Sequence, residues 1–385
     1  FTAFFAVNNL YIYRIKEKKM AIYIHQLKNW PHLQWDEQAF ISLLSEVRNL
    51  QGKLIGKVEL LGFQLKDEAN LETLIQDVIQ TSEIEGEILN PELVRSSIAT
   101  RLGLEYSGIE HSDRNVNGIV ELMIDATQNN NKIVTDERLF GWHAALFPTG
   151  RSGMYKIEVG QWRSGAMQVV SGGMGKETVH YEAPKAELLA TEMKQFINWF
   201  NDEQNLESLL KAAIAHLWFI TIHPFDDGNG RIARAITDMQ LSIADGINQR
   251  FYSMSTEINK QKKGYYTILE RTQKGDLDIT EWIIWFLECL KKSILSSNTI
   301  VDKVVKKHHF WVKNASLISN ERQHLMVNKL LDHFEGNFNT SKWAKMTKTS
   351  TDTALRDITD LVNKGILLKA DSGGRSTHYV INDKF

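Results

Sequence analysis

The sequence predicts a mainly α-helical protein with one β-hairpin in its middle and a small module of helices and strands at its C-terminal end. From Ala39 to Leu93, apolar residues return every three or four positions, which is the spacing of one buried helix face. Further helical patterns lie near 115–129, 136–146, 185–201, 205–221, 231–245, 258–273 and 278–297. Patterns typical of strands are confined to residues 160–184 and to the end of the chain.

Size and composition are those of an ordinary globular chain. Its 385 residues suggest two or three domains, with 43% hydrophobic and 24% charged residues. We expect no membrane contact, because no apolar run approaches the roughly 20 residues of a spanning helix. Cys289 is the only cysteine, which excludes a disulfide or a cysteine-based metal site within one chain. A reducing compartment, the cytoplasm, is the expected location.

Composition divides the chain into four parts. Residues 1–19 begin apolar and then become basic, the reverse of a signal peptide, so we interpret them as a leader or an extended reading frame before Met20. Residues 20–100 form a helical N-terminal region, 101–297 a helical core and 310–385 a C-terminal module. Small polar residues from Ser293 to Asn298 suggest a boundary without a long flexible linker.

The hairpin is predicted between residues 160 and 184. Two β-prone pieces, Gln168 to Val170 and Thr178 to Tyr181, flank a turn that contains three glycines. Glycine permits the positive φ that such a turn needs, and Pro184 ends the strand pairing because it has no N–H to donate. The alternative to a functional role is a plain surface hairpin.

The segment HPFDDGNGRIAR, residues 223–234, reads as a loop that leads into a helix. Pro224 disfavours helical backbone at His223, so the preceding helix should end there. Gly228 and Gly230 allow a ligand to approach the backbone, whose free N–H groups at a helix start can cradle a phosphate. We therefore expect an anionic ligand.

Charged residues of this segment extend the hypothesis. Arg231 and Arg234 are three positions apart, so they share a helix face and can grip successive phosphates. Asp227 offers a carboxylate oxygen for Mg²⁺, which usually takes only one or two protein carboxylates. His223 is the candidate base, because imidazole titrates near the pH at which a hydroxyl must lose its proton. Taken alone, a His before Pro is more often structural, but the whole set predicts in-line displacement at phosphorus.

The segment resembles the signature of the Fic family, His-Pro-Phe-any-acid-Gly-Asn-Gly-Arg with a second Arg after two residues, and every position matches. The resemblance implies a Fic helical core that transfers AMP from ATP to a Ser, Thr or Tyr hydroxyl of a target protein. It makes His223 the base and Asp227 the Mg²⁺ ligand. It places around the ATP phosphates Gly228, Asn229, Gly230, Arg231 and Arg234.

The resemblance also assigns a role to the hairpin, because Fic proteins carry a flap upstream of their motif. Arg163 matches a residue type common at the start of that flap. The strand edge would dock an extended target peptide, with these candidate residues: Val169, Val170, His180 and Tyr181. Tyr265 and Tyr266 occupy the place from which tyrosines reach adenine or ribose in the family, although packing is the alternative role.

An inhibitory element is implied further upstream. The segment from Thr81 to Gly86 resembles the family pattern of Ser or Thr, three residues, Glu, then Gly or Asn, on a helix expected near 75–90. A glutamate at position 85 that paired with Arg234 would occupy the outer phosphate site and hold the enzyme off. The ordinary alternative for Glu85 is a solvated side chain.

The C-terminal module reads as three helices followed by a hairpin with strands at Ile366 to Lys369 and Thr377 to Ile381, which resembles a winged helix-turn-helix. Residues 301–385 carry 14 Lys/Arg and 9 Asp/Glu, a net charge of +5 against −7 for the rest. This basic balance is a weak indication of nucleic-acid contact.

DNA contact would involve the third helix of that module. The resemblance places in the DNA groove Thr351, Thr353 and Arg356, and near phosphates Lys342, Lys345, Lys348 and Arg375. The acidic residues Asp352, Asp357 and Asp360 oppose binding to a duplex. Winged helices also serve in dimerisation or protein docking, which is the alternative.

Other functions compete with AMP transfer. The same site could transfer another nucleotide, phosphate or phosphocholine, or could remove AMP with Glu85 as the base that activates water. A different class is a DNA-binding regulator whose core senses a nucleotide. Because Fic proteins often pair, a homodimer is a further expectation.

Overall fold

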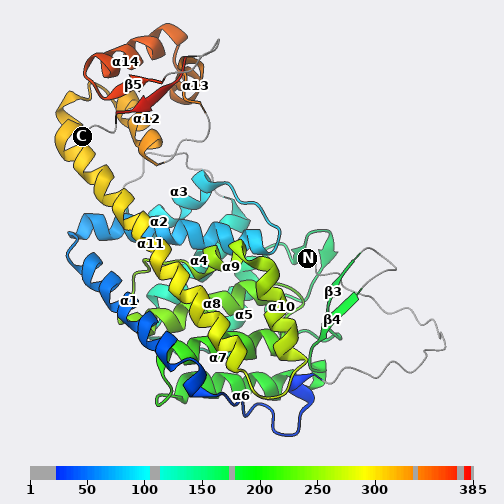
Figure 1. Cartoon of the computed structure of the whole chain (residues 1–385). Coiled ribbons are helices and arrows are strands. Elements are labelled where there is room, and N and C mark those ends of the chain that lie inside the picture. Colours follow the sequence, from blue (N-terminus) through cyan, green and yellow to red (C-terminus); the bar gives the residue numbers. More distant parts are fainter. Residues whose placement is uncertain (1–22, 105–112, 173–177, 333–336, 371–376, 383–385) are drawn as a thin grey trace. The chain divides into compact units, whose positions relative to one another are not determined.

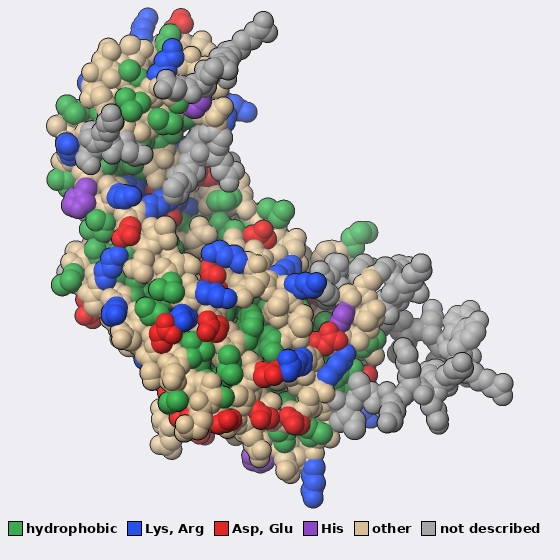
Figure 2. Space-filling view, in the orientation of Figure 1, with side chains coloured by type: hydrophobic (Ala, Val, Ile, Leu, Met, Phe, Trp, Pro, Cys, Tyr) green, Lys and Arg blue, Asp and Glu red, His purple; other side chains and the backbone are tan. Residues whose placement is uncertain are grey.

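The computed structural model describes residues 23–104, 113–172, 178–332, 337–370 and 377–382 (Figure 1). Helices dominate these residues, which confirms the predicted mainly α fold class. The expected leader at 1–19 and Arg375 lie outside the described residues. None of the described helices combines the length and apolar character needed to cross a bilayer. On the face shown in Figure 2, acidic and basic side chains are interspersed among neutral and apolar ones.

The chain divides after Val301 into two compact units. The helices of the first unit are α1 (Ile41–Glu59), α2 (Phe63–Ile84), α3 (Pro91–Leu102), α4 (Arg114–Gln128), α5 (Asp136–Leu146), α6 (Leu189–Asp202), α7 (Ser208–Ile222), α8 (Asn229–Asp245), α9 (Met254–Lys260) and α10 (Lys262–Gln273). A long helix, α11 (Thr280–Asn314), runs across the division.

The core of the first unit is built around α7. Every residue of this helix from Leu209 to Ile222 is buried, so other elements must surround it on all sides. Helix α8 packs along it, and the indole N–H of Trp282 on α11 donates to the carbonyl of Ala213 at 2.8 Å. The loop 223–228 therefore connects two buried helices, which hold both of its ends.

Two helix boundaries differ from the prediction. The helix expected over 258–273 is split at Gln261, which leaves helical backbone geometry (φ −118°, ψ 33°) between α9 and α10. The helix expected to end near residue 297 continues to Asn314. The hydroxyls of Ser293 and Ser297 donate to the carbonyls of Leu290 and Ile294, so these small polar residues satisfy their hydrogen bonds within the helix.

The predicted hairpin is present. Strands β3 (Gln168–Ser171) and β4 (Thr178–Glu182) pair antiparallel, with Val169 opposite Tyr181. The sequence pattern did not reveal a second, very short hairpin, β1 (Arg151–Ser152) and β2 (Tyr155–Lys156), which lies just after α5.

The second unit has the expected order of helix, helix, helix and hairpin. Its elements are α12 (Glu321–Leu331), α13 (Thr340–Thr347), α14 (Thr351–Asn363), β5 (Leu367–Lys369) and β6 (Tyr379–Ile381). A separate core joins them, made of Met326, Val327, Phe338, Trp343, Ala354, Ile358 and Leu361 among others. Side chains of Asn339 and Ser350 cap the starts of α13 and α14.

Candidate active site

The loop at His223 is held in an uncommon backbone conformation. Helix α7 ends at Ile222, and His223 takes left-handed angles (φ 52°, ψ 59°), which are unfavourable for a non-glycine residue. Buried Arg163 supports this turn, because its Nε donates to the carbonyl of His223 at 2.8 Å and its backbone N–H to that of Pro224 at 2.9 Å. Arg163 also donates to the Pro184 carbonyl, so one side chain ties the hairpin base to the loop.

The ring of His223 is prepared to accept a proton. Its Nδ1 lies 3.0 Å from the carbonyl oxygen of Ile220, which can only accept, so Nδ1 carries the hydrogen. The other nitrogen, Nε2, then keeps its lone pair. Burial lowers the pKa of His223 to about 4, so the imidazole is neutral at pH 7. This is the state that a general base requires.

Asn229 braces the loop from the first position of α8. Its Oδ1 accepts from the backbone N–H of Phe225 at 2.9 Å, and its Nδ2 donates to the carbonyl of the same residue at 2.8 Å. The Phe225 ring stacks on His143, with ring centres 4.2 Å apart. Both polar atoms of the Asn229 side chain thus hydrogen-bond to the loop, so Asn229 would contact a phosphate through its backbone N–H.

The first turn of α8 is an anion cradle. Within the described residues, the backbone N–H groups of Asn229, Gly230 and Arg231 have no hydrogen-bond acceptor. Such groups at a helix start favour negative charge. Arg234 adds a buried guanidinium whose Nη1 has no partner among the described residues. A Cβ at Gly230 would collide with Oε1 of Glu85, so that carboxylate lies directly over this turn.

Glu85 and Thr81 bind Arg234. Helix α2 ends at Ile84, and Glu85 Oε1 accepts from Arg234 Nη2 at 2.7 Å. Thr81 accepts twice from the same guanidinium, through Oγ1 at 2.6 Å and its carbonyl at 3.0 Å. Gly86, at φ 86°, turns the chain away after the pair. Burial raises the pKa of Glu85, but Arg234 outweighs burial and holds it below its ordinary value, so Glu85 is ionised.

Glu87 is a site residue that the sequence pattern did not indicate. Its Oε2 accepts from Arg231 Nη1 at 3.1 Å. Each arginine of the motif is therefore paired with one carboxylate from the segment that ends α2, Arg234 with Glu85 and Arg231 with Glu87. The Arg231 guanidinium also lies 5.0 Å from the centre of the Phe147 ring. An acid two positions after Glu85 was the only signal in the sequence.

Asp227 has the features of a cation ligand. Its Oδ1 accepts from the N–H of Gly228 at 2.6 Å, and its Oδ2 accepts from the hydroxyl of Ser152 in β1. Each carboxylate oxygen can accept twice, so both keep capacity for a hard cation. The side chain is partly exposed beside the cradle, and these residues fit Mg²⁺.

Two tyrosines of α10 lie in different environments. Tyr265 is buried, and its hydroxyl lies 2.8 Å from His216 Nε2, with Trp285 against its ring. This placement favours packing over contact with a nucleotide. Tyr266 is partly exposed, and burial together with the nearby Glu85 raises the pKa of its hydroxyl. Only Tyr266 remains a candidate for the adenine or ribose contact.

The four hairpin residues predicted to dock a target peptide also differ in their exposure to solvent. Val170 and Tyr181 are buried, and the Tyr181 hydroxyl donates to the carbonyl of Thr221 at 2.7 Å. Their expected role in peptide docking is therefore wrong, because both side chains are buried and that of Tyr181 anchors the hairpin to α7. Val169 is partly exposed, as is His180, so these two keep the proposed docking role.

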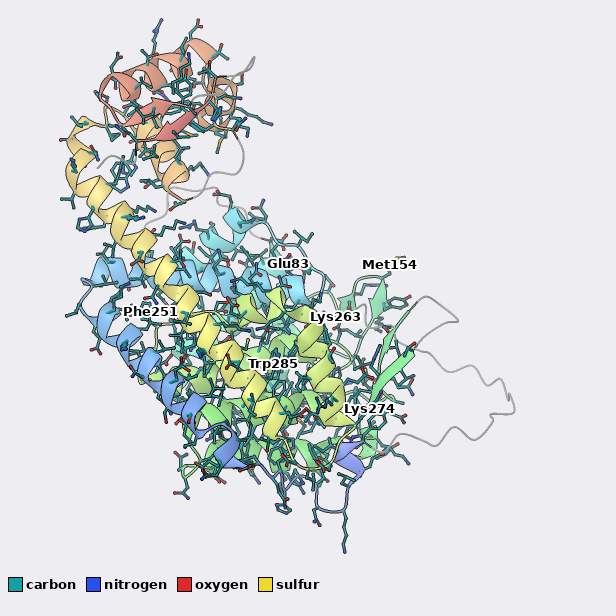
Figure 3. The ribbon with its side chains drawn as sticks, viewed as in Figure 1. Glu83, Met154, Phe251, Lys263, Lys274 and Trp285 are labelled. Carbon is teal, nitrogen blue, oxygen red and sulfur yellow. The ribbon has the colours of Figure 1, made fainter. Side chains whose placement is uncertain are left out.

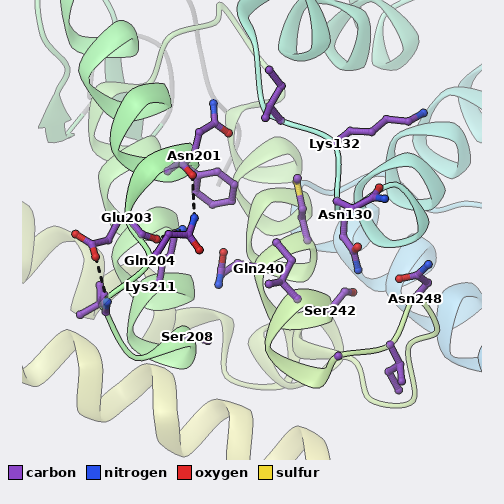
Figure 4. A pocket seen from close by; sticks show the side chains of 18 residues that line it. Asn130, Lys132, Asn201, Glu203, Gln204, Ser208, Lys211, Gln240, Ser242 and Asn248 are labelled. Atoms are coloured by element: carbon purple, nitrogen blue, oxygen red, sulfur yellow. Dashed lines mark hydrogen bonds between the residues drawn. The ribbon is translucent and has the colours of Figure 1, made fainter.

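A cavity of about 440 Å³ lies away from this site, at the C-terminal end of α8 (Figure 4). Amide and hydroxyl side chains line much of it, including Asn130, Ser208 and Gln240. The buried Oε1 of Gln240 has no partner among the described residues. None of the residues expected from the sequence to form the active site lines this cavity.

Fold and site together define a helical protein in which a neutral, half-buried histidine precedes an anion-binding helix start. Comparison with protein families identifies the domain that holds this site, because residues 133–241 match the Fic/DOC family. Residues 133–241 therefore form a Fic domain. Residues 23–104 match a second model, described as a domain of unknown function, DUF4172.

Similar proteins include two named protein adenylyltransferase Fic. The one from Drosophila mojavensis is 27% identical over 229 residues, which cover 59% of this chain and 41% of that protein. The one from Culex quinquefasciatus is 27% identical over 232 residues, covering 59% and 42%. The chain thus spans about two fifths of the length of these relatives.

Solved structures that align with this chain include two described as Fic proteins. A Fic family protein from Desulfovibrio desulfuricans has a TM-score of 0.49 at 18% identity and covers 90% of this chain and 97% of its own. A Fic domain containing signaling protein from Bacteroides thetaiotaomicron has a TM-score of 0.48 at 20% identity, covering 70% and 97%.

Proposed function

We propose that this protein is a protein adenylyltransferase that moves AMP from ATP to a Ser, Thr or Tyr hydroxyl of a target protein. The observation that carries the proposal is the Nε2 of neutral His223, which has no hydrogen bond to any described residue, together with the N–H cradle that begins α8. The names of its relatives support the same activity.

The chemistry follows from the placement of these groups. His223 Nε2 takes the proton of the target hydroxyl, whose oxygen attacks the α-phosphorus of ATP while the bond to pyrophosphate breaks. The N–H groups of residues 229–231 and the side chains of Arg231 and Arg234 stabilise the phosphate charge. Asp227 would hold Mg²⁺, which neutralises part of that charge when bound. The exposed edge of the hairpin would hold the target peptide.

Glu85 sets the resting state in this proposal. Its carboxylate lies over Gly230 and pairs with Arg234, where a phosphate of ATP would have to bind. Two anions cannot share one guanidinium at low cost, so ATP binds productively only after Glu85 leaves. The enzyme is therefore autoinhibited.

The test uses ATP labelled on either the α or the γ phosphate. We expect Glu85→Gly to raise α-label incorporation into proteins, His223→Ala to abolish it, and no γ label to transfer. Glu83→Gly is the matched control, because Glu83 is exposed and lies two residues before Glu85 (Figure 3).

Other outcomes of this test point to the alternatives. Equal labelling by wild type and Glu85→Gly at matched ATP and Mg²⁺ would reject autoinhibition. Transfer of the γ label would indicate phosphate transfer, and loss of AMP from a pre-labelled protein would indicate removal with Glu85 as the base. Labelling with other nucleotides in place of ATP tests the choice of nucleotide.

We also propose that the second unit, whose order of helices and hairpin resembles a winged helix, contacts DNA through α14. Two acids that would oppose a duplex are engaged within the unit. Asp357 accepts from Arg322 at 2.8 Å and Asp360 from Lys364 at 2.6 Å, whereas Thr351 and Arg356 are exposed. Gel shifts with genomic fragments should show binding that weakens as salt rises and that Arg356→Ala reduces. No binding at low salt would contradict the proposal.

The cytoplasmic location and the homodimer stay predictions.

A further inference from the structure

A hydrogen-bonded series on the hairpin includes His180, one of the two docking candidates, but takes no part in the AMP transfer described above. Ser171 Oγ is 2.5 Å from His180 Nε2, and His180 Nδ1 is 2.8 Å from Glu270 Oε2. A carboxylate can only accept, so Nδ1 carries the hydrogen and Nε2 accepts from the serine hydroxyl. This order of contacts is the one by which a histidine prepares a serine for nucleophilic attack.

The three residues come from separate elements, β3, β4 and α10. Lys274, at the C-terminal end of α10, lies 2.6 Å from the other carboxylate oxygen of Glu270 (Figure 3). Partial burial raises the pKa of Glu270, but hydrogen bonds from Lys274 and His180 outweigh it and hold the pKa below its ordinary value. Glu270 is therefore ionised at neutral pH and fixes the orientation of the His180 ring.

The series is open to solvent. Side chains of His180 and Glu270 are 23% and 35% exposed, and Ser171 is partly exposed. The next residue, Gly172, has a φ of 109°, which favours glycine, and its N–H has no acceptor among the described residues. In α/β-hydrolases, the N–H of the residue after the nucleophile donates to the negative oxygen formed during attack. Gly172 stands at that position.

We propose that Ser171, His180 and Glu270 form a second reactive site, which cleaves carboxylic esters without ATP. Ser171 Oγ attacks the carbonyl carbon and gives its proton to His180 Nε2, which returns the proton to the alcohol as the C–O bond breaks. Water then gives a proton to His180 and attacks the acyl-serine, which releases the carboxylic acid and restores the hydroxyl. Each step balances without a metal or a redox partner.

A fluorophosphonate probe tests the nucleophile directly in the full chain, without ATP or Mg²⁺. Ser171 Oγ should displace fluoride from phosphorus, and mass spectrometry should find the label on Ser171. We expect Ser171→Ala to abolish labelling and His180→Gln to slow it by about 100-fold, because a positioned base typically contributes 10²- to 10⁴-fold. Glu270→Gln should slow it by about 10-fold, and hydrolysis of p-nitrophenyl acetate should follow the same order.

Two controls separate reactivity from folding. Ser164 Oγ lies 2.5 Å from Glu158 Oε1, so Ser164→Ala removes a hydrogen-bonded serine that has no histidine partner, and should leave labelling unchanged. His180→Gln keeps hydrogen-bonding groups but supplies no base, so its Tm should stay near that of the wild type. Absence of label on Ser171, or equal labelling of His180→Gln and wild type, would overturn the proposal.

Discussion

At the residue scale, the state of the site depends on which anionic group pairs with each buried cationic side chain. Arg234 is 2% exposed, and leaving a guanidinium so deeply buried without an anion would be costly. Glu85 supplies the anion and Thr81 a hydrogen-bond acceptor for this guanidinium while no nucleotide is bound. In the proposed function, a phosphate of ATP would pair with the same guanidinium, so Glu85 and ATP would compete for one buried cation.

Glu87 should inhibit AMP transfer in the same way as Glu85, but more weakly. Its side chain is 38% exposed, and exposed pairs contribute about 0–1 kcal/mol, a factor of up to about 5 in an equilibrium. We expect Glu87→Gln to raise α-label incorporation up to about fivefold, and Glu85→Gly to raise it further. Initial labelling rates at subsaturating ATP measure both variants. A Glu87→Gln rate equal to that of the wild type would remove Glu87 from the regulation.

The pH profile should reveal the lowered pKa of His223. The base is active when neutral, and its pKa is about 4, so AMP labelling by Glu85→Gly should stay flat from pH 8 down to about pH 5 and then fall. Removal of Glu85 takes away a charge that raises the pKa of His223, which shifts this fall to still lower pH. Initial rates corrected for folded fraction give the profile; a midpoint near 6.5 would mean a solvated histidine.

At the element scale, α2 meets α8 through residues one turn apart. Asp77 and Thr81 on α2 and Glu85 just after its end follow at four-residue spacing. The hydroxyl of Ser253 donates to Asp77 within the same core. Asp77 is fully buried, which raises its pKa, and Asp238 of α8 raises it further. The contact between Ser253 and Asp77 therefore holds α2 one turn before Thr81.

The start and the end of α8 should respond differently to alanine. Gly228 has φ 79°, and a Cβ there would lie 2.9 Å from the Phe147 ring, whereas Gly246 has φ 69° with no atom within 4 Å. Left-handed backbone costs a non-glycine residue about 1–2 kcal/mol. We expect Gly246→Ala to lose about 1 kcal/mol and Gly228→Ala about 2–4 kcal/mol, because the clash adds to the strain. Urea unfolding measures both; equal losses would show that the ring moves aside freely.

At the scale of the whole molecule, four histidines of the first unit are kept neutral by burial. The pKa is lowered to about 4 for His25, His143 and His223, and to about 3 for His216. The unfolded chain binds these protons near pH 6.5, so it carries more protons than the folded chain between about pH 6.5 and 4. Their contribution to stability is complete above pH 6.5 and is lost as the pH falls toward 4.

Thermal unfolding should therefore show a Tm that falls steadily below about pH 6.5. Each extra proton on the unfolded chain adds about 1.4 kcal/mol per pH unit to the slope of stability. We expect His216→Gln to flatten this slope, and the matched change at exposed His309 to leave it as in the wild type. Calorimetry from pH 4.5 to 8 measures it. A Tm constant over that range would contradict the neutral state of these residues.

The sequence by itself determined the local features of this protein. Helix α7 ended before Pro224 as predicted, and two β-prone pieces around a glycine-rich turn located the hairpin. The motif predicted a base at His223 and an anion cradle at the start of α8. These features depend on backbone chemistry and on spacing along a few turns, which a sequence displays directly.

Only the tertiary structure decided which distant groups meet. Glu85 and Arg234 are 149 positions apart, and Arg231 finds Glu87 across a similar separation. Tyr265 turned inward to His216, and His180 met Glu270 90 positions away. Periodicity shows that a helix face is buried but not which face of which helix covers it, so these contacts come from the packing of α2 on α8 and of α10 beside the hairpin.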